Sequence, residues 1–110
     1  MEISSSTENG IAVVSIEGNL DTTTSTDALD HISGLMDGGE SKILVDFTAV
    51  DFVASSGLRI LLVTAKRLKS EGGSLRICGL NESVNEVFEM SGFSTILNVF
   101  PSRDDALSGF

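Results

Sequence analysis

The sequence predicts a single α/β domain over residues 1–110. Short apolar runs typical of strands alternate along the chain with segments whose apolar residues recur at helical spacing. The order strand, strand, helix, strand, helix, strand, helix, strand, helix predicts a mixed, mostly parallel sheet of about five strands. We expect about four helices to pack mainly on one side of this sheet.

Each element has its own signal in the sequence. Strands are expected where apolar residues form short runs or alternate with polar ones, over residues 3–6, 11–17, 42–47, 74–78 and 95–100. Helices are expected where apolar residues recur every three or four positions, over residues 26–36, 55–71, 81–90 and 104–107. Asn9 and Gly10 tolerate positive φ and predict the turn of a β-hairpin. Thr24 or Ser25 can cap the first helix after a polar loop over residues 18–23.

A pair of serines stands at the junction between the central strand and the helix that follows it. The strand-like run of Ile43, Leu44 and Val45 precedes Ser55 and Ser56, and an amphipathic helix pattern follows them. These hydroxyls are therefore expected in the first turn of a helix, where backbone N–H groups lack partners and the helix dipole is positive. A phosphate would be tolerated there. The junction is predicted to be a phosphorylatable switch.

The residues around these serines resemble those of the STAS-domain anti-sigma-factor antagonists, which are bacterial partner-switching regulators. Residues 52–58 read Phe-Val-Ala-Ser-Ser-Gly-Leu and are similar to the family motif that contains the acceptor serine. Further similar segments stand in the family's order and spacing, at residues 18–21, 43–47, 72–75 and 88–93. Ala54 stands where many phosphorylated members carry Asp. The resemblance implies a STAS-like single domain.

The resemblance also implies a function in partner switching. The unphosphorylated protein would bind an anti-sigma factor that is also a serine protein kinase, and the sigma factor held there would be released. Phosphorylation of Ser55 would abolish this binding, because the interface would then have to desolvate a dianion. The kinase partner would bind ATP and Mg, since the chain has no glycine-rich nucleotide loop. A serine phosphatase would reset the switch.

The resemblance assigns roles to individual residues. Ser55 is the predicted acceptor, with Ser56 as the second choice; both could instead be only turn and cap residues. The expected partner-binding residues are Asp21, Thr22, Ser55, Ser56, Gly57 and Arg59. The loop that holds Asp21 is expected near the acceptor, although Asp21 also fits an Asx-turn. Asp46 is predicted to hydrogen-bond the loop before the serines, and Asp51 is predicted to be a turn residue.

Composition and charge exclude several function classes. The chain has 7 Lys and Arg against 16 Asp and Glu, and its net charge of −9 argues against nucleic acid or an anionic membrane as the partner. Neither a membrane-spanning stretch nor a signal peptide is apparent, so we expect a cytoplasmic protein without direct membrane binding. The single cysteine, Cys78, is expected to be a buried reduced thiol. A monomer is expected because each predicted helix has one apolar face.

Cations gather in one predicted helix. Four of the seven cations, Arg59, Lys66, Arg67 and Lys69, lie within the helix that follows the serines. Their spacing fits both a solvated helix face and a partner-docking face, and the sequence leaves these two interpretations open.

Enzyme and metal-site interpretations find little support. A receiver-like phospho-acceptor at Asp46 would need an acidic pair after the first strand and a lysine after the last. The sequence offers only Glu17 and Asp21, and no lysine follows Arg76. A serine hydrolase would need a base near the serine, but the only histidine, His31, lies on a predicted helix. We expect no enzyme activity, catalytic residue, cofactor or metal site. The remaining alternative is a non-switching STAS scaffold, or an accessory subunit of a stress-sensing or membrane transport assembly.

Overall fold

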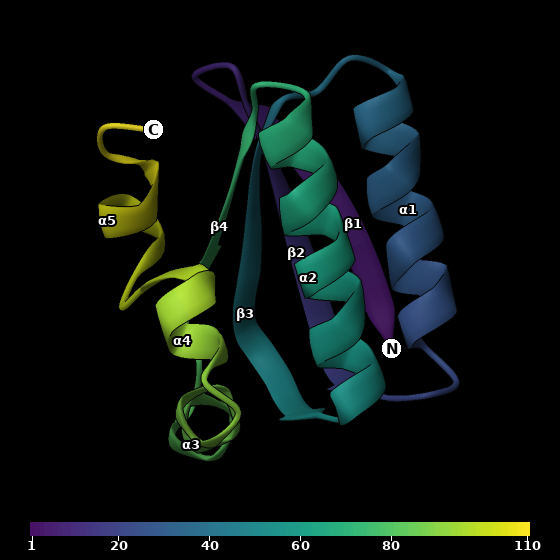
Figure 1. The fold of residues 1–110 in the computed structure, drawn as a ribbon, viewed down its shortest axis with the longest axis vertical. Helices are drawn as coiled ribbons and strands as arrows, with labels where there is room; N and C mark the ends of the chain where they lie inside the picture. The colour runs from purple at the N-terminus through teal and green to yellow at the C-terminus, as the bar shows by residue number, and fades with distance from the viewer.

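A central five-stranded sheet organises the chain, with strand order β1-β2-β3-β4-β5 (Figure 1). The computed structural model describes the backbone of residues 1–110 and every side chain except those of Thr95 and Ile96. The strands are β1 (Glu2–Glu8), β2 (Ile11–Leu20), β3 (Lys42–Val53), β4 (Ser74–Cys78) and β5 (Asn98–Phe100). The helices are α1 (Ser25–Asp37), α2 (Ser55–Ser70), α3 (Glu82–Met90), α4 (Phe93–Ile96) and α5 (Arg103–Leu107). β1 is antiparallel to β2 and the other neighbouring strands are parallel, which confirms the predicted mixed, mostly parallel sheet.

A tight hairpin joins β1 to β2, as predicted. Glu8 pairs with Ile11, and the two residues between them, Asn9 and Gly10, have φ values of 53° and 79°. A two-residue hairpin turn of this kind needs positive φ at both positions, which asparagine and glycine tolerate.

β2 and β3 are longer than the sequence predicted. β2 continues to Leu20, so the loop predicted over residues 18–23 is wrong for its first three residues. β3 continues to Val53 instead of ending at residue 47. The sequence hides this extension because the pairing of the two strands shifts register twice, which breaks the regular alternation of buried and exposed residues. Asp51 consequently lies within β3, and its predicted role as a turn residue is wrong.

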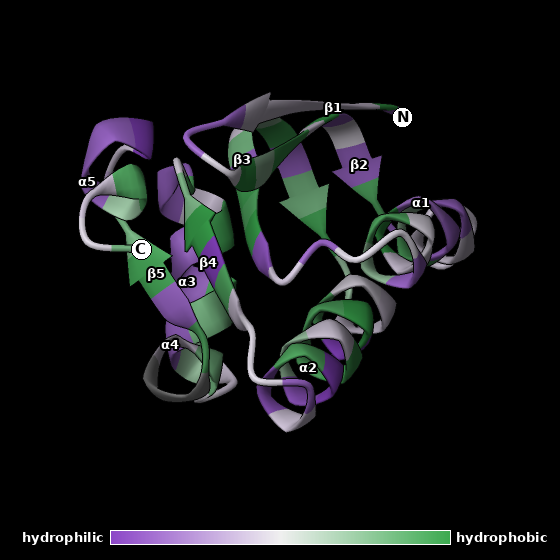
Figure 2. Cartoon of the chain, turned by 90° about the horizontal axis from the view of Figure 1, so that it is seen from above, coloured by the Kyte–Doolittle hydropathy of each residue, from purple (hydrophilic) through white to green (hydrophobic). Residues whose placement is uncertain are grey.

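Two apolar cores lie on the two faces of the sheet. The larger core packs α1, α2 and α3 against one face, and it includes the buried side chains of Ile32, Leu61 and Phe88. The smaller core lies beneath α5 on the other face and includes Leu44 and Ala106. Seen from above in Figure 2, α1 and α2 lie together on one side of the sheet and α5 lies on the other. The expectation that helices pack mainly on one side is confirmed.

The apolar stripe of α2 faces the larger core, as its spacing predicted. Leu58, Leu61 and Leu68 are buried. Thr64 is buried among them, and its hydroxyl donates a hydrogen bond of 2.8 Å to the Ile60 carbonyl one turn earlier. This bond satisfies the hydroxyl of the one polar side chain on the inward face of α2. Because the apolar stripe faces the core, the opposite face of α2 is left for solvent or a partner.

The chain after α3 departs from the prediction. Residues 95–100 were expected to form a strand, but residues up to Ile96 belong to α4 and only Asn98–Phe100 forms β5. Gly92, the N-cap residue of α4, adopts a φ of 78°, which lets the chain turn from α3 into this short helix. The final helix, predicted over 104–107, begins one residue earlier and is capped by the Ser102 hydroxyl.

No helix in the part of the chain that the structure describes has the length and apolar character needed to cross a membrane.

Candidate functional site

The end of β2 holds the junction between β3 and α2 in place. α2 begins at Ser55, and Ala54 is its N-cap residue, with an extended backbone. The Ala54 amide donates a hydrogen bond of 2.9 Å to the Leu20 carbonyl. The Ala54 carbonyl in turn accepts from the amides of Gly57 and Leu58 at 2.9 and 3.1 Å. The first turn of α2 is thereby fixed to two strands of the sheet.

Gly57 allows α2 to approach β2 closely. A Cβ added at this position would lie 2.9 Å from both Cγ and the carbonyl oxygen of Leu20, which is closer than non-bonded atoms normally come. Gly57 is also buried. Of the residues predicted to bind a partner, this one has a packing role in the structure.

The two serines differ in exposure and in contacts. Ser55 is exposed, whereas Ser56 is half-buried. The Ser56 hydroxyl lies 3.3 Å from Ser25 Oγ and 3.5 Å from Thr22 Oγ1. Ala54 occupies the N-cap position, so neither serine caps α2, and the alternative that they serve only as cap residues is wrong. Among the described residues, the amides of Ser55 and Ser56 have no hydrogen-bond acceptor, as expected at a helix N-terminus.

Asp21 shapes the loop beside the serines. Its Oδ1 accepts hydrogen bonds from the Thr23 amide at 3.0 Å and the Thr24 amide at 3.1 Å, and also from the Thr24 hydroxyl at 3.2 Å. These bonds, led by that from the Thr24 amide, hold the pKa of Asp21 below its ordinary value. The Ser25 hydroxyl donates to the Asp21 carbonyl. The Asx-turn interpretation of Asp21 is confirmed, and its carboxylate stays ionised at neutral pH.

Sheet topology brings this loop and the serines together. β2 and β3 are neighbouring parallel strands, and Leu20 pairs with Val53, so both strands end at the same edge of the sheet. The residue that sequence reasoning missed is Ser25, which was expected only as a possible helix cap. The sequence signal that could have found Ser25 is the run of polar residues directly after β2, which ends at the same sheet edge as the serines. Arg59 is exposed one turn beyond Ser55, on the same helix.

The chain matches a known family over almost its whole length. Residues 2–106 match the family model of the STAS domain. The chain belongs to the STAS domain family. This confirms the resemblance that the serine motif and its flanking segments indicated.

Relatives and solved structures agree with this assignment. The STAS domain is 32% identical over 102 residues to BtrV of Bordetella bronchiseptica, covering 93% of this chain and 88% of that protein. It is 26% identical to the anti-sigma F factor antagonist of Paenibacillus polymyxa, covering 98% of this chain and 93% of that one. The crystal structure of an anti-sigma factor antagonist from Mycobacterium paratuberculosis has the same fold, with a TM-score of 0.90 at 24% identity, covering 97% of this chain and 91% of that one. Homologues of this STAS domain are thus named as anti-sigma factor antagonists, which are regulatory binding proteins.

Asp46 lies away from the serine junction of the STAS domain. Its carboxylate accepts hydrogen bonds from the amide and hydroxyl of Thr48 at 2.9 and 2.5 Å, and it forms an ion pair of 3.0 Å with Arg103 of α5. Burial acts to raise the pKa of Asp46, but the bonds from Thr48 and Arg103 outweigh it and lower the pKa. The predicted hydrogen bond from Asp46 to the loop before the serines is therefore wrong, because β3 continues past this residue and α5 covers it.

His31 and Cys78 lie within the fold, away from the serine junction. His31 lies half-buried on α1, with its Nε2 3.2 Å from the Ser5 hydroxyl of β1. Cys78 is a buried free thiol, as predicted, and burial followed by the nearby Asp46 charge raises its pKa to about 12. Among the described residues, no group of three or more His, Cys, Asp or Glu side chains could hold a metal ion.

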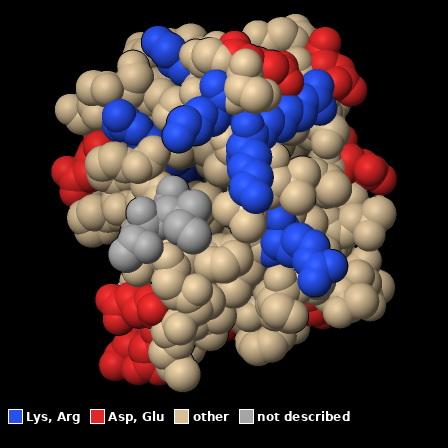
Figure 3. Space-filling model, in the orientation of Figure 1, with Lys and Arg blue, Asp and Glu red and all other residues tan. Residues whose placement is uncertain are grey.

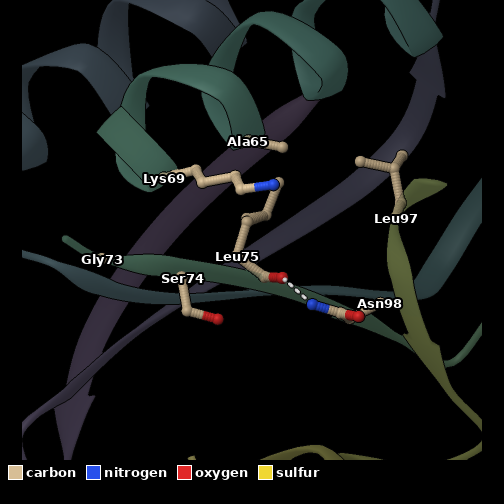
Figure 4. A pocket seen from close by; sticks show the side chains of 7 residues that line it. All are labelled: Ala65, Lys69, Gly73, Ser74, Leu75, Leu97 and Asn98. Carbon is tan, nitrogen blue, oxygen red and sulfur yellow. Dashed lines mark hydrogen bonds between the residues drawn. The ribbon is translucent and has the colours of Figure 1, made fainter. Parts of the chain in front are cut away.

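A hollow of about 290 Å³ lies at the opposite end of α2 from the serines. Its lining residues come from α2, from the start of β4 and of β5, and from the residue before each of these strands: Ala65, Lys69, Gly73, Ser74, Leu75, Leu97 and Asn98 (Figure 4). The Lys69 side chain extends into it above Leu75. Ser55 does not line this hollow and is exposed, and an exposed hydroxyl suits a macromolecular partner better than a small substrate.

Proposed function

We propose that this STAS domain is an anti-sigma factor antagonist switched by phosphorylation of Ser55. Its unmodified form binds an anti-sigma factor that is also a serine kinase, and the sigma factor is released. The phosphorylated form no longer binds. The observation that carries the proposal is an exposed Ser55 hydroxyl at the first residue of α2, beside the Asp21 turn, in a domain whose relatives are named anti-sigma factor antagonists.

Exposure favours Ser55 over Ser56 as the acceptor. A kinase must reach the hydroxyl oxygen, and the Ser55 side chain is open to solvent. The Ser56 hydroxyl is half-buried and contacts Ser25 and Thr22. Phosphorylating Ser56 would require breaking these contacts, whereas a phosphate on Ser55 needs no rearrangement.

The junction can accept a phosphate without a change of fold. A phosphate adds about −1.5 to −2 charges at neutral pH. The amides of Ser55 and Ser56, which have no acceptor among the described residues, and the positive end of the helix dipole lie beside it. The first turn of α2 contains no acidic residue, and Ala54 adds none at the N-cap. The folded domain should therefore change little, while the surface that a partner meets changes in charge.

Loss of binding follows from the cost of burying that charge. An interface that covers Ser55 and the exposed Thr22 would have to remove water from a dianion, and only a matching cation on the partner could compensate. The partner would supply ATP and Mg for the transfer, and a serine phosphatase would reverse it.

The test starts with the unmodified protein as bait, so that the retained partner is identified. Affinity for that partner is then measured for Ser55→Ala, Ser55→Asp and Ser4→Asp, which places the same charge on exposed Ser4 of β1. We expect Ser55→Ala and Ser4→Asp to bind like the natural protein and Ser55→Asp to bind more weakly by at least about tenfold. Equal affinity of all variants would refute the switch.

A second arm identifies the acceptor. The retained partner, with ATP and Mg, should add one phosphate to the peptide containing Ser55 and Ser56. The modification should persist in Ser56→Ala and disappear in Ser55→Ala. No phosphate from any retained partner would favour a non-switching scaffold.

A further inference from the structure

The outward face of α2 is a basic surface on an acidic protein. The helix contains Arg59, Lys66, Arg67 and Lys69 and no Asp or Glu, although the chain has a net charge of −9. Figure 3 shows Lys and Arg side chains gathered on the face where α2 lies in Figure 1, with acidic side chains mainly at the edges of the view. A patch of one sign on a body of the other is a feature that partner binding uses.

Only some of these cations are free to meet a partner. Arg67 is paired with Asp37 at 2.6 Å and with Glu71 at 2.9 Å. Lys69 extends into the hollow of Figure 4. Arg59 and Lys66 are exposed, and no ion pair joins either of them to another described residue.

An apolar side chain lies between the two free cations. Val63 is 48% exposed, so its apolar side chain is available for contact with a partner. Residues four and seven positions apart share one helix face, so Arg59, Val63 and Lys66 form one strip, called here the α2 strip. Ser55 stands four residues before Arg59 and thus at the start of the same strip.

We propose that the α2 strip binds an acidic segment of the partner, and that a phosphate on Ser55 withdraws Arg59 from that segment by pairing with it within the same helix. This inference rests on the proposed function; it specifies the chemistry of the partner segment and adds a second contribution to release, beside the cost of burying the phosphate. The partner segment carries carboxylates toward Arg59 and Lys66, and an apolar side chain between them toward Val63.

The spacing favours the internal pair. Side chains four positions apart on a helix have Cβ atoms about 5 to 6 Å from each other, and an anion N-terminal to a cation is the better order. The planar guanidinium matches the oxygens of a phosphate. No ion pair joins Arg59 to another residue that the structure describes, so a phosphate can pair with it without displacing a described partner.

The internal pair is tested without any kinase. Phosphoserine is incorporated at position 55 during translation of the full chain, and the second ionisation of the phosphate is followed by ³¹P NMR. Removing a cation disfavours the dianion, so Arg59→Gln should raise the phosphate pKa by about 0.3 units. Lys66→Gln, two further turns along the same face, should leave the value unchanged. Equal shifts in both variants, or none in Arg59→Gln, would overturn the pairing.

The docking role is tested with a synthetic peptide in which one leucine is flanked by glutamates. Titration of ¹⁵N-labelled unmodified protein should shift the amides of Arg59, Val63 and Lys66. Arg59→Gln should weaken binding by about threefold, whereas Lys42→Gln, which removes an exposed cation from β3, should not. An absence of shifts on α2 would overturn the acidic-segment assignment.

A double comparison separates capture of Arg59 from direct repulsion. Phosphoserine at position 55 should weaken peptide binding in the natural sequence but add little further loss in Arg59→Gln, because the captured cation is already missing. Full additivity would mean that the phosphate repels the peptide by itself and would refute capture. The proposed function fails on a different result, namely that no retained kinase modifies Ser55.

Discussion

Arginines on the two faces of this STAS domain differ in their contacts. On the α5 face, Arg76 donates hydrogen bonds to the carbonyls of Ala106 at 2.9 Å, Ser108 at 2.8 Å and Gly109 at 3.0 Å. Its guanidinium also lies 4.8 Å from the ring centroid of Phe100 and 4.6 Å from that of Phe110. On the α2 face, Arg59 is exposed and joins no ion pair with a described residue.

The difference separates cations that hold the fold together from cations that are exposed to a partner. Arg76 and Arg103 fasten the C-terminal segment to the sheet, since Arg103 reaches Asp46 and also the Ser15 hydroxyl at 3.2 Å. Their removal should therefore cost stability. Arg59 and Lys66 contribute nothing comparable to the fold, so their removal should affect a partner and leave stability almost unchanged.

The largest stability effect is expected for Arg76→Met. This change keeps the aliphatic stem but removes three hydrogen bonds and two cation–π contacts, and it should lower the free energy of unfolding by about 2 to 3 kcal/mol. Lys66→Met, measured in the same urea titration, should change it by less than about 0.5 kcal/mol. Similar losses in the two variants would break the distinction between the faces.

Labelling of Cys78 gives a local readout for the same variant. The thiol is buried in the smaller core beneath α5, and its pKa of about 12 keeps it protonated at neutral pH. Iodoacetamide should modify it slowly in the natural protein and faster in Arg76→Met, because the C-terminal segment would open more often.

Gly57→Ala is expected to have the next largest effect. The added methyl group would meet Leu20 at 2.9 Å and should push the start of α2 away from β2, lowering stability by about 2 kcal/mol. Gly34→Ala on α1 is the matched control, since a Cβ there meets nothing within 4 Å and alanine favours the helix. Thermal unfolding of both variants should show a decrease for Gly57→Ala and a small increase for Gly34→Ala; the same sign in both would contradict the close packing at the junction.

The ion pair between Asp46 and Arg103 should appear in the pH dependence of stability. The pKa of Asp46 is lower in the folded protein than in the unfolded chain, where it is about 3.9. Ionised Asp46 therefore stabilises the folded protein above the unfolded pKa, and this stabilisation is lost as the pH falls through the folded pKa. Asp46→Asn should lower stability by about 1 kcal/mol at pH 7, and the difference should shrink below pH 4.

Asp37→Asn is the control for that measurement. Asp37 pairs with Arg67 on the surface, with 69% of its side chain exposed, so its loss should change stability by less than about 0.5 kcal/mol. A pH-independent difference between Asp46→Asn and the natural protein would argue against an ionised Asp46 in the fold.

Much of the fold could be predicted because its signals are local. The Asn9-Gly10 turn and the apolar stripe of α2 each depend on neighbours within a few residues. The pairing of Asp46 with Arg103 joins residues 57 apart in sequence, and no local pattern encodes it. The contact between Ser25 and Ser56 likewise exists only because β2 and β3 end at one sheet edge, so the sequence indicated the serines but not the surface around them.

The smallest expected effect concerns charge at the two ends of α2. Ser55→Asp places a carboxylate near the positive end of the helix and should raise stability by about 0.5 kcal/mol. Ser70→Asp places the same charge at the last helical residue and should not raise it. Urea titrations of both variants at low salt test this, and an equal gain at both ends would remove the electrostatic argument for Ser55.

The most direct test compares the unmodified protein with the protein that carries phosphoserine at position 55, each titrated with the partner that the unmodified protein retains. We predict that the unmodified protein binds tightly and that the phosphorylated protein has an affinity at least about a hundredfold lower. The NMR spectra of the two forms should show the same fold. Equal affinities of the two forms would contradict the account.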